Sequence, residues 1–191
     1  MKLIRELEEL QPEMQKWRRD IHAHPEIAFE EHRTSKIVIE KLKSFGIEVD
    51  SGIAGTGVVG TLKKGQGNRS IALRADLDAL LINETNDFDH KSKTPGKMHA
   101  CGHDGHTTML LGAAKYLSEH GDFDGTIHFI FQPAEENEGG GKVMVDEGLF
   151  EKYPVEAVYG MHNIPGMAVG TFAIKPGPIM ASFDIFNLKV I

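Results

Sequence analysis

GTIHFIFQPAEE, residues 125–136, is the stretch of this chain that decides its fold class. Its first part, residues 125–132, is an apolar run of the kind that forms a strand inside a parallel or mixed sheet. Two adjacent acids, Glu135 and Glu136, follow the strand directly. Because open α/β sheets bind ligands beyond the ends of their strands, the position of these acids indicates a functional site.

Helical and extended segments alternate on both sides of this strand. Helices are expected where apolar residues recur every three or four positions, and strands where short apolar runs end at glycine or proline. The expected helices cover residues 3–21, 31–45 and 108–117, with a short one after a glycine-rich loop in 139–148. The expected strands cover residues 57–64, 70–76, 157–162 and 169–177, in addition to 125–132, and the first two are expected to pair as a hairpin. The pattern predicts an α/β fold with a mixed central sheet flanked by helices.

The composition excludes several classes of protein. The chain has 191 residues and a formal net charge of −7, without a block of Lys and Arg, so no nucleic-acid partner is expected. No stretch approaches the roughly 18 consecutive apolar residues of a membrane span, and the first residues lack the apolar run of a signal peptide. Cys101 is the single cysteine, which excludes an intramolecular disulfide. These features favour a cytoplasmic protein without a membrane partner.

The densest group of metal-ligand residues lies in MHACGHDGH, residues 98–106. Its candidates are His99, Cys101, His103, Asp104 and His106. Thiolate and imidazole are preferred ligands of zinc and similar ions. In an irregular loop flanked by glycines, Cys101 and His103 can turn toward one ion, so the motif predicts a metal site. A competing interpretation makes Cys101 a nucleophile with a nearby histidine as its base.

Two further groups of candidates follow expected strands. Glu135 and Glu136 are adjacent on an extended segment, so their side chains point in different directions. One carboxylate can therefore bind a metal ion while the other accepts a proton from a metal-bound water. His162 closes the strand expected over 157–162. Alone it would be read as a hydrogen-bonded core residue, but beside the other two groups it is the expected third contributor.

Six motifs, in this order, resemble the M20 metallopeptidase family, within the branch of aminoacylases, hippurate hydrolases and auxin-conjugate (IAA-amino acid) hydrolases. They are WRRDIHAHPE (17–26), ALRADLDAL (72–80), PGKMHACGHDGH (95–106), FQPAEE (131–136), YGMHNIPG (159–166) and KPGPIMAS (175–182). The specific ones are CGHDGH and PAEE. The resemblance runs from about Trp17 to the last residue, and it departs at Leu81, where family members commonly have proline.

The resemblance implies a zinc-exopeptidase-like catalytic domain that hydrolyses the amide bond of N-acyl amino acids, such as hippurate or N-acetyl amino acids. The implied cofactors are two divalent metal ions, and zinc, manganese, nickel and cobalt all suit the ligand types. The implied partner is the small-molecule N-acyl amino acid, with a homodimer in the full-length family. By motif position, the metal ligands are Cys101, His103, Glu136 and His162, the general base that activates the metal-bridging water is Glu135, and Asp76 and Asp104 are similar to residues that orient a ligand imidazole.

The resemblance also divides the chain. Related enzymes are longer and insert a lid and dimerisation domain near SFDIFNLKVI. Residues 1–181 are therefore expected to be the N-terminal part of the catalytic domain, and 182–191 the first strand of a lid and dimerisation domain that is otherwise missing. Two alternatives stay open: a truncated, inactive half-enzyme that retains partial metal binding, and a zinc-stabilised binding module without catalysis.

Overall fold

The computed structural model describes residues 4–136, 138–180 and 186–190, and within these ranges it is built around a mixed sheet with strand order β1-β2-β4-β3-β5. The strands are β1 (Glu48–Ile53), β2 (Gly57–Lys64), β3 (Ser70–Asp76), β4 (Gly125–Gln132) and β5 (Val158–Gly160). The helices are α1 (Arg5–Ala23), α2 (His32–Ser44), α3 (His103–His120), α4 (Gly140–Asp146) and α5 (Leu149–Lys152). The predicted α/β fold with a mixed sheet flanked by helices is confirmed.

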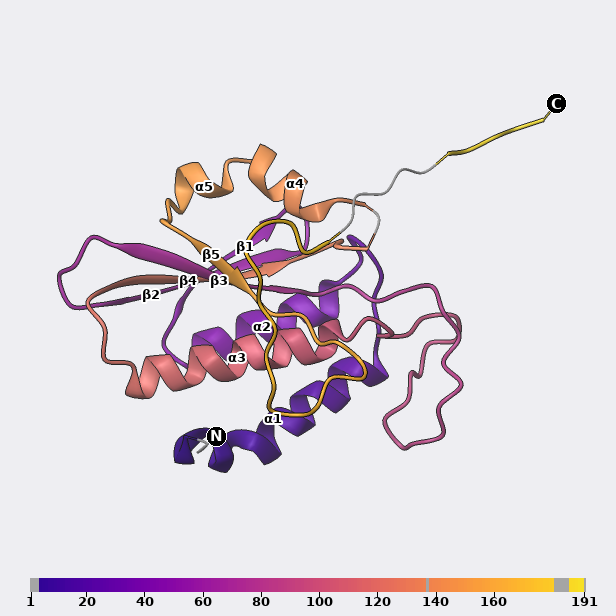
Figure 1. Ribbon diagram of the computed structural model, residues 1–191, viewed down its shortest axis with the longest axis horizontal. Helices are drawn as coiled ribbons and strands as arrows, with labels where there is room; N and C mark the ends of the chain where they lie inside the picture. Colours follow the sequence, from indigo (N-terminus) through magenta and orange to yellow (C-terminus); the bar gives the residue numbers. More distant parts are fainter. Residues whose placement is uncertain (1–3, 137, 181–185, 191) are drawn as a thin grey trace.

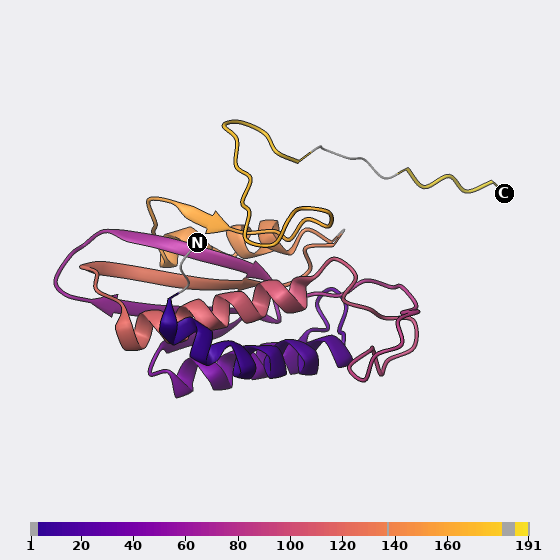
Figure 2. The same ribbon diagram turned by 60° about the horizontal axis from the view of Figure 1, so that its bottom comes forward.

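The helices form layers on both faces of the sheet. Figures 1 and 2 show α2 and α3 along one face, with α1 packed on α3, and the short α4 and α5 on the other face. The central strand β4 is buried from both sides: Phe129 and Phe131 pack in the core on the α2–α3 face, while Ile130 packs with the residues under α4 and α5. All three are at most 3% exposed, as expected for an interior strand without polar alternation.

The predicted hairpin between residues 57–64 and 70–76 is wrong. β4 lies between these two strands, antiparallel to β2 and parallel to β3. The hairpin partner of β2 is β1, a strand that the sequence pattern did not predict because its residues are half-buried or exposed without regular alternation. A turn-like sequence between two strands does not decide their pairing. A third, more apolar strand that lies between them buries more apolar surface on both of its faces, and this stabilises the alternative order.

The strand expected over residues 169–177 is also wrong. This segment has no strand, and Val169, Phe172 and Ile174 are largely exposed. Alternating apolar residues form a strand only where a neighbouring strand pairs with their N–H and C=O groups. The strand expected over 182–191 falls mostly outside the described residues, and its described part, 186–190, is not in a strand.

The third helix begins earlier than predicted, at His103 and not at residue 108. Gly102, in the left-handed conformation with φ of 99°, precedes it, so the CGHDGH motif spans the end of a loop and the first turn of α3. A side chain at this position would collide with the side-chain amide of Asn163. Among the described residues, no helix is both long enough and apolar enough to span a membrane.

Candidate metal centre

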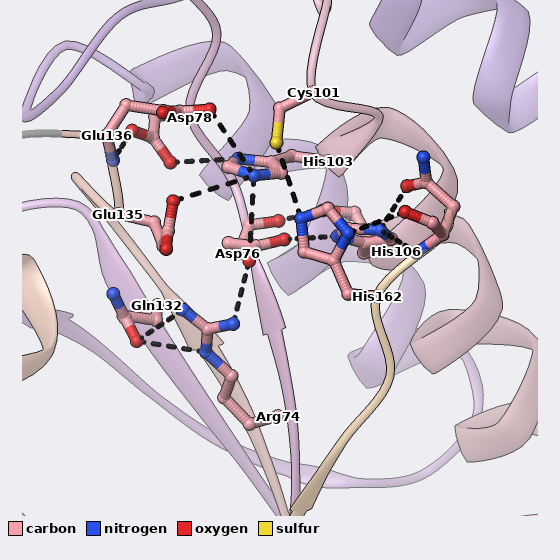
Figure 3. A network of polar contacts seen from close by, with 12 residues as sticks. Arg74, Asp76, Asp78, Cys101, His103, His106, Gln132, Glu135, Glu136 and His162 are labelled. Atoms are coloured by element: carbon pink, nitrogen blue, oxygen red, sulfur yellow. Dashed lines mark hydrogen bonds and ion pairs between the residues drawn. The ribbon is translucent and has the colours of Figure 1, made fainter. Parts of the chain in front are cut away.

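The candidate ligands gather at one edge of the sheet. β3, β4 and β5 run parallel, so their carboxyl ends meet at this edge. Asp76 ends β3, Glu135 and Glu136 follow β4, and His162 follows β5. The first turn of α3 brings His103 to the same place (Figure 3). This is the position at which open α/β sheets bind their ligands.

His103 is shared by all the groups of potential metal ligands found among the described residues. Each group holds three residues whose ligand atoms lie within 4.8 Å of one another. The groups are Cys101, His103 and His162; His103, Glu135 and Glu136; and Asp76, His103 and His106. The structure therefore brings together the predicted ligands Cys101, His103, Glu136 and His162, with the predicted base Glu135 beside them.

The imidazole of His103 is fully buried and oriented by a carboxylate. Its Nδ1 lies 3.1 Å from Oδ1 of Asp78, so an Nδ1–H donated there leaves the lone pair of Nε2 facing the site. Among the described residues, that Nε2 has no hydrogen-bond partner; it lies 3.8 Å from a carboxylate oxygen of Glu135 and 3.8 Å from one of Glu136. Oε1 of Glu136 is also buried and has no hydrogen-bond partner in the part of the chain that the structure describes. A cation between these atoms satisfies both, so the residues present fit a metal ion.

Electrostatics at His103 favour a positive charge. Burial lowers its pKa, but the Asp78 hydrogen bond and the charges of Asp76 and Glu136 outweigh it, and the pKa of His103 is raised overall. The same carboxylates that favour a proton on this ring favour a metal ion next to it.

Cys101 does not have the environment of an activated nucleophile. Burial, followed by the effects of Glu136 and Glu135, raises the pKa of its thiol to about 12. A catalytic thiolate needs a lowered pKa, which cations provide and carboxylates oppose. Sγ of Cys101 lies 3.3 Å from Nε2 of His162. Of the two interpretations of Cys101, the structure favours the metal ligand, because a bound metal ion deprotonates a coordinating thiol.

The two adjacent acids differ in exposure. The side chain of Glu135 is 39% exposed and that of Glu136 is 21% exposed. The backbone N–H of Glu136 donates to Oδ2 of Asp78 at 2.8 Å, so Asp78 holds this segment as well as His103. The carboxylate of Glu135 is thus the more accessible to solvent, while that of Glu136 is directed into the buried side of the site.

His106 is occupied at both ring nitrogens. Its Nδ1 lies 2.7 Å from Oδ1 of Asp76, and its Nε2 accepts the backbone N–H of Asn163 at 3.1 Å. Burial raises the pKa of Asp76, but His106, His103 and Arg74 lower it to about 2, so Asp76 is a carboxylate at neutral pH. His106 therefore ties the end of β3 to the loop after β5, next to His162, and has no free lone pair for an ion.

Asp104 lies in a different network. Its Oδ2 accepts hydrogen bonds from Nδ1 of His22 at 3.0 Å and from Nε of Arg18 at 3.1 Å. Nε2 of His22 in turn lies 3.0 Å from Glu84. Asp104 thus orients His22, which is not among the predicted ligands. His99 is buried in this neighbourhood, and neither of its ring nitrogens has a hydrogen-bond partner within residues 4–136, 138–180 and 186–190.

Sequence reasoning missed Asp78, the residue that orients His103. A signal for it was present: Asp76 and Asp78 are two positions apart in ALRADLDAL, at the end of a buried strand. Side chains two apart on an extended segment point to the same side. Asp78 is fully buried and hydrogen-bonded, as this spacing would allow.

Comparisons with known proteins agree with this geometry. The profile of peptidase family M20/M25/M40 matches residues 72–189. The chain is 50% identical to a hippurate hydrolase from Campylobacter jejuni, over 100% of this chain and 50% of that protein. It is 44% identical to an N-acyl-L-amino acid amidohydrolase from Geobacillus stearothermophilus, over 97% of this chain and 50% of that protein. The chain spans about half the length of the curated relatives it matches.

A solved structure shares the fold. The YXEP protein of Bacillus subtilis, described as a dinuclear metal binding peptidase from the M20 family, superposes with a TM-score of 0.85 at 40% identity. The match covers 90% of this chain and 48% of that protein. With a family profile that matches more than half of its residues, and with residues that could bind a metal ion gathered at one edge of its sheet, this chain belongs to peptidase family M20/M25/M40.

Proposed function

We propose that this chain carries the metal-binding part of a hydrolase that cleaves the amide bond of N-acyl amino acids. The observation that carries the proposal is the pair Glu135 and Glu136, two adjacent carboxylates of different exposure. Both lie near Nε2 of His103, which has no hydrogen-bond partner among the residues that the structure describes. The names of the relatives from Campylobacter jejuni and Geobacillus stearothermophilus support this substrate class.

The proposed ligands are Cys101, His103, Glu136 and His162, which supply sulfur, nitrogen and oxygen atoms suited to a borderline metal. The description of the YXEP protein as dinuclear supports two ions per complete site. When bound, divalent ions would polarise the carbonyl of the amide and lower the pKa of a water molecule in the site.

Glu135 is the proposed general base. It removes a proton from the attacking water as the water oxygen forms its bond to the acyl carbon. It returns the proton to the amino-acid nitrogen as the carbon–nitrogen bond breaks, so that water and amide become a carboxylic acid and an amine. The partly exposed carboxylate of Glu135 can reach a substrate without leaving its place beside His103.

The experiment is hydrolysis of hippurate and several N-acetyl amino acids by the purified 191-residue chain, loaded in turn with zinc, manganese, cobalt or nickel. We expect Glu135→Gln to lower kcat by at least about 100-fold while the metal bound per chain is unchanged. Glu138→Gln is the matched control, because Glu138 is an exposed acid of the same loop.

Two outcomes would contradict this function. Turnover that persists after chelation would exclude the proposed metal dependence. Turnover that persists in Glu135→Gln would exclude Glu135 as the general base. A fully metal-loaded chain without turnover on any of these amides would exclude hydrolysis of this substrate class by the chain.

A further inference from the structure

Glu31 is a buried carboxylate that neither the sequence motifs nor the proposed reaction account for. It lies just before α2 and is 0% exposed. Among the described residues, no Lys, Arg or His forms an ion pair with it, and burial raises its pKa. Burying a carboxylate without a cation costs folding free energy, and the hydrogen bonds of Glu31 indicate a function that offsets this cost.

Both oxygens of Glu31 accept hydrogen bonds from distant parts of the chain. Oε1 accepts the backbone N–H of Ala134 at 2.8 Å, and Oε2 accepts the hydroxyl of Thr56 at 2.5 Å. Ala134 directly precedes Glu135 and is itself 0% exposed. Glu31 therefore contacts the backbone of the loop that carries the proposed base.

The backbone of Ala134 has an unfavourable conformation that its surroundings must stabilise. Its φ is 50°, in the left-handed region that a residue with a Cβ rarely adopts. The N–H of Ala134 donates to Glu31, and its C=O accepts the N–H of Gly140 at 2.8 Å. Strained backbone of this kind persists only when its surroundings fix it, and it is concentrated at functional sites.

Two carboxylates bracket the acid pair. Glu31 holds the N–H before Glu135, and Asp78 holds the N–H of Glu136 at 2.8 Å while it also orients His103. We propose that Glu31 is a positioning residue, which keeps Ala134 in its left-handed conformation and so directs the carboxylates of Glu135 and Glu136 toward His103. This inference rests on the proposed function for its kinetic consequence, but its structural consequence stands apart from that function.

The chemistry of Glu31 suggests a set of variants. Glu31→Gln keeps an oxygen for the N–H of Ala134, and the Thr56 hydroxyl can rotate to accept from the new amide. Glu31→Ala removes both acceptors and leaves two buried donors unpaired. Glu26→Ala is the matched control: Glu26 accepts the N–H groups of Arg33 and Thr34 at the start of the same helix and has no hydrogen bond to Ala134.

The experiment measures hydrogen exchange at the Ala134 amide, zinc affinity by competition titration, and kcat and KM on hippurate. In Glu31→Ala we expect Ala134 to lose its protection from exchange, zinc affinity to fall about tenfold, and kcat to fall about 100-fold with KM nearly unchanged. Glu31→Gln should restore all three quantities, and Glu26→Ala should change none of them.

The outcomes separate the two proposals. If no form of the chain hydrolyses hippurate but exchange and zinc affinity change as expected, the positioning role of Glu31 stands and the hydrolase proposal fails. If Glu31→Ala matches Glu26→Ala in all three measurements, the positioning role is overturned. Should Glu31→Ala not fold, Glu31→Asp replaces it, because the shorter carboxylate cannot reach both Thr56 and Ala134; unchanged protection at Ala134 in that variant would also overturn the proposal.

Discussion

His22 and His103 are two buried histidines whose Nδ1 atoms both contact an aspartate, but whose Nε2 atoms have different surroundings. Nδ1 of His22 lies 3.0 Å from Asp104, and Nδ1 of His103 lies 3.1 Å from Asp78. Nε2 of His22 lies 3.0 Å from Glu84, whereas Nε2 of His103 has no hydrogen-bond partner in the described part of the chain. One imidazole is enclosed by two carboxylates, and the other is oriented by one and left open toward Cys101, Glu135 and Glu136.

The difference shows how one arrangement closes off both ring nitrogens of a histidine and the other leaves one ring nitrogen available to a metal ion. In the first network both ring nitrogens lie within hydrogen-bond distance of carboxylates, which favours the charged form of the ring, and His22 links α1, α3 and the loop that carries Glu84. In the second, Asp78 fixes the tautomer of His103 and leaves its lone pair for a cation. The second ring nitrogen of a buried histidine, with or without a carboxylate partner, thus decides whether the ring is available to a metal ion.

The largest expected effect is on metal binding by the open histidine. His103→Asn should weaken zinc binding by more than about 100-fold, because it removes a proposed ligand itself and not only a residue that orients a ligand. His22→Asn should keep the metal content and zinc affinity of the unchanged chain. Metal per chain after dialysis and a competition titration measure both, and equal losses in the two variants would show that the two histidines do not differ as described.

The next effect concerns the aspartates that orient the rings. Asp78→Asn should lower zinc affinity by roughly 10- to 100-fold, because it weakens both the orientation of His103 and the anchoring of Glu136. Asp104→Asn should leave zinc affinity unchanged. The same titration decides this, and a larger loss in Asp104→Asn than in Asp78→Asn would transfer the supporting role to the residue that the motif suggested.

The enclosed histidine should matter for stability. His22→Asn leaves the buried carboxylates of Asp104 and Glu84 without their shared partner, and should lower the free energy of unfolding of the metal-free protein by about 2 kcal/mol. Urea unfolding followed by circular dichroism measures this. A variant as stable as the unchanged chain would mean that the network contributes no net stability.

The smallest effect is the pH dependence of that stability. The hydrogen bond to Asp104 raises the pKa of His22 above its ordinary value of 6.5, against the opposing effect of burial and with support from Glu84. Because the folded-state pKa is the higher one, this contribution is complete below about pH 6.5 and is lost as the pH rises through the raised value.

The difference in unfolding free energy between the unchanged chain and His22→Asn should therefore shrink by about 1 kcal/mol as the pH rises from 6 toward 9. Urea unfolding at a series of pH values measures it. A difference that grows with pH would contradict the assignment of a charged His22.

The motifs of this chain led to many of the residues that gather at the site. Strong ligand types that follow apolar runs or stand between glycines make these positions candidates, and the resemblance to the family singles out Cys101, His103, Glu136 and His162, which lie together in the structure. Their roles as ligands stay a prediction. The start of α3 at His103 was not anticipated, because the loop and helix positions of CGHDGH look alike in a local pattern.

The supporting residues could not be found in the same way. Asp78 reaches its partner His103 across 25 positions, and Glu31 reaches Ala134 across 103 positions. A lone acid beside a helix or a strand end looks like a solvated side chain until its distant partner is known. The resemblance to the family implies that Asp104 supports a ligand imidazole, yet the fold turns it toward His22.

The sequence by itself determined the class of fold, the buried strand over residues 125–132 and the kinds of ligand that follow it, because apolar periodicity and residue chemistry are properties of neighbouring positions. Only the tertiary structure decided that β4 lies between β2 and β3, and that Cys101 meets His162 across 61 positions. Strand order and hydrogen-bond partners depend on how all the apolar faces are buried together. The burial of all apolar faces is a property of the whole chain, so it cannot be predicted from any one segment.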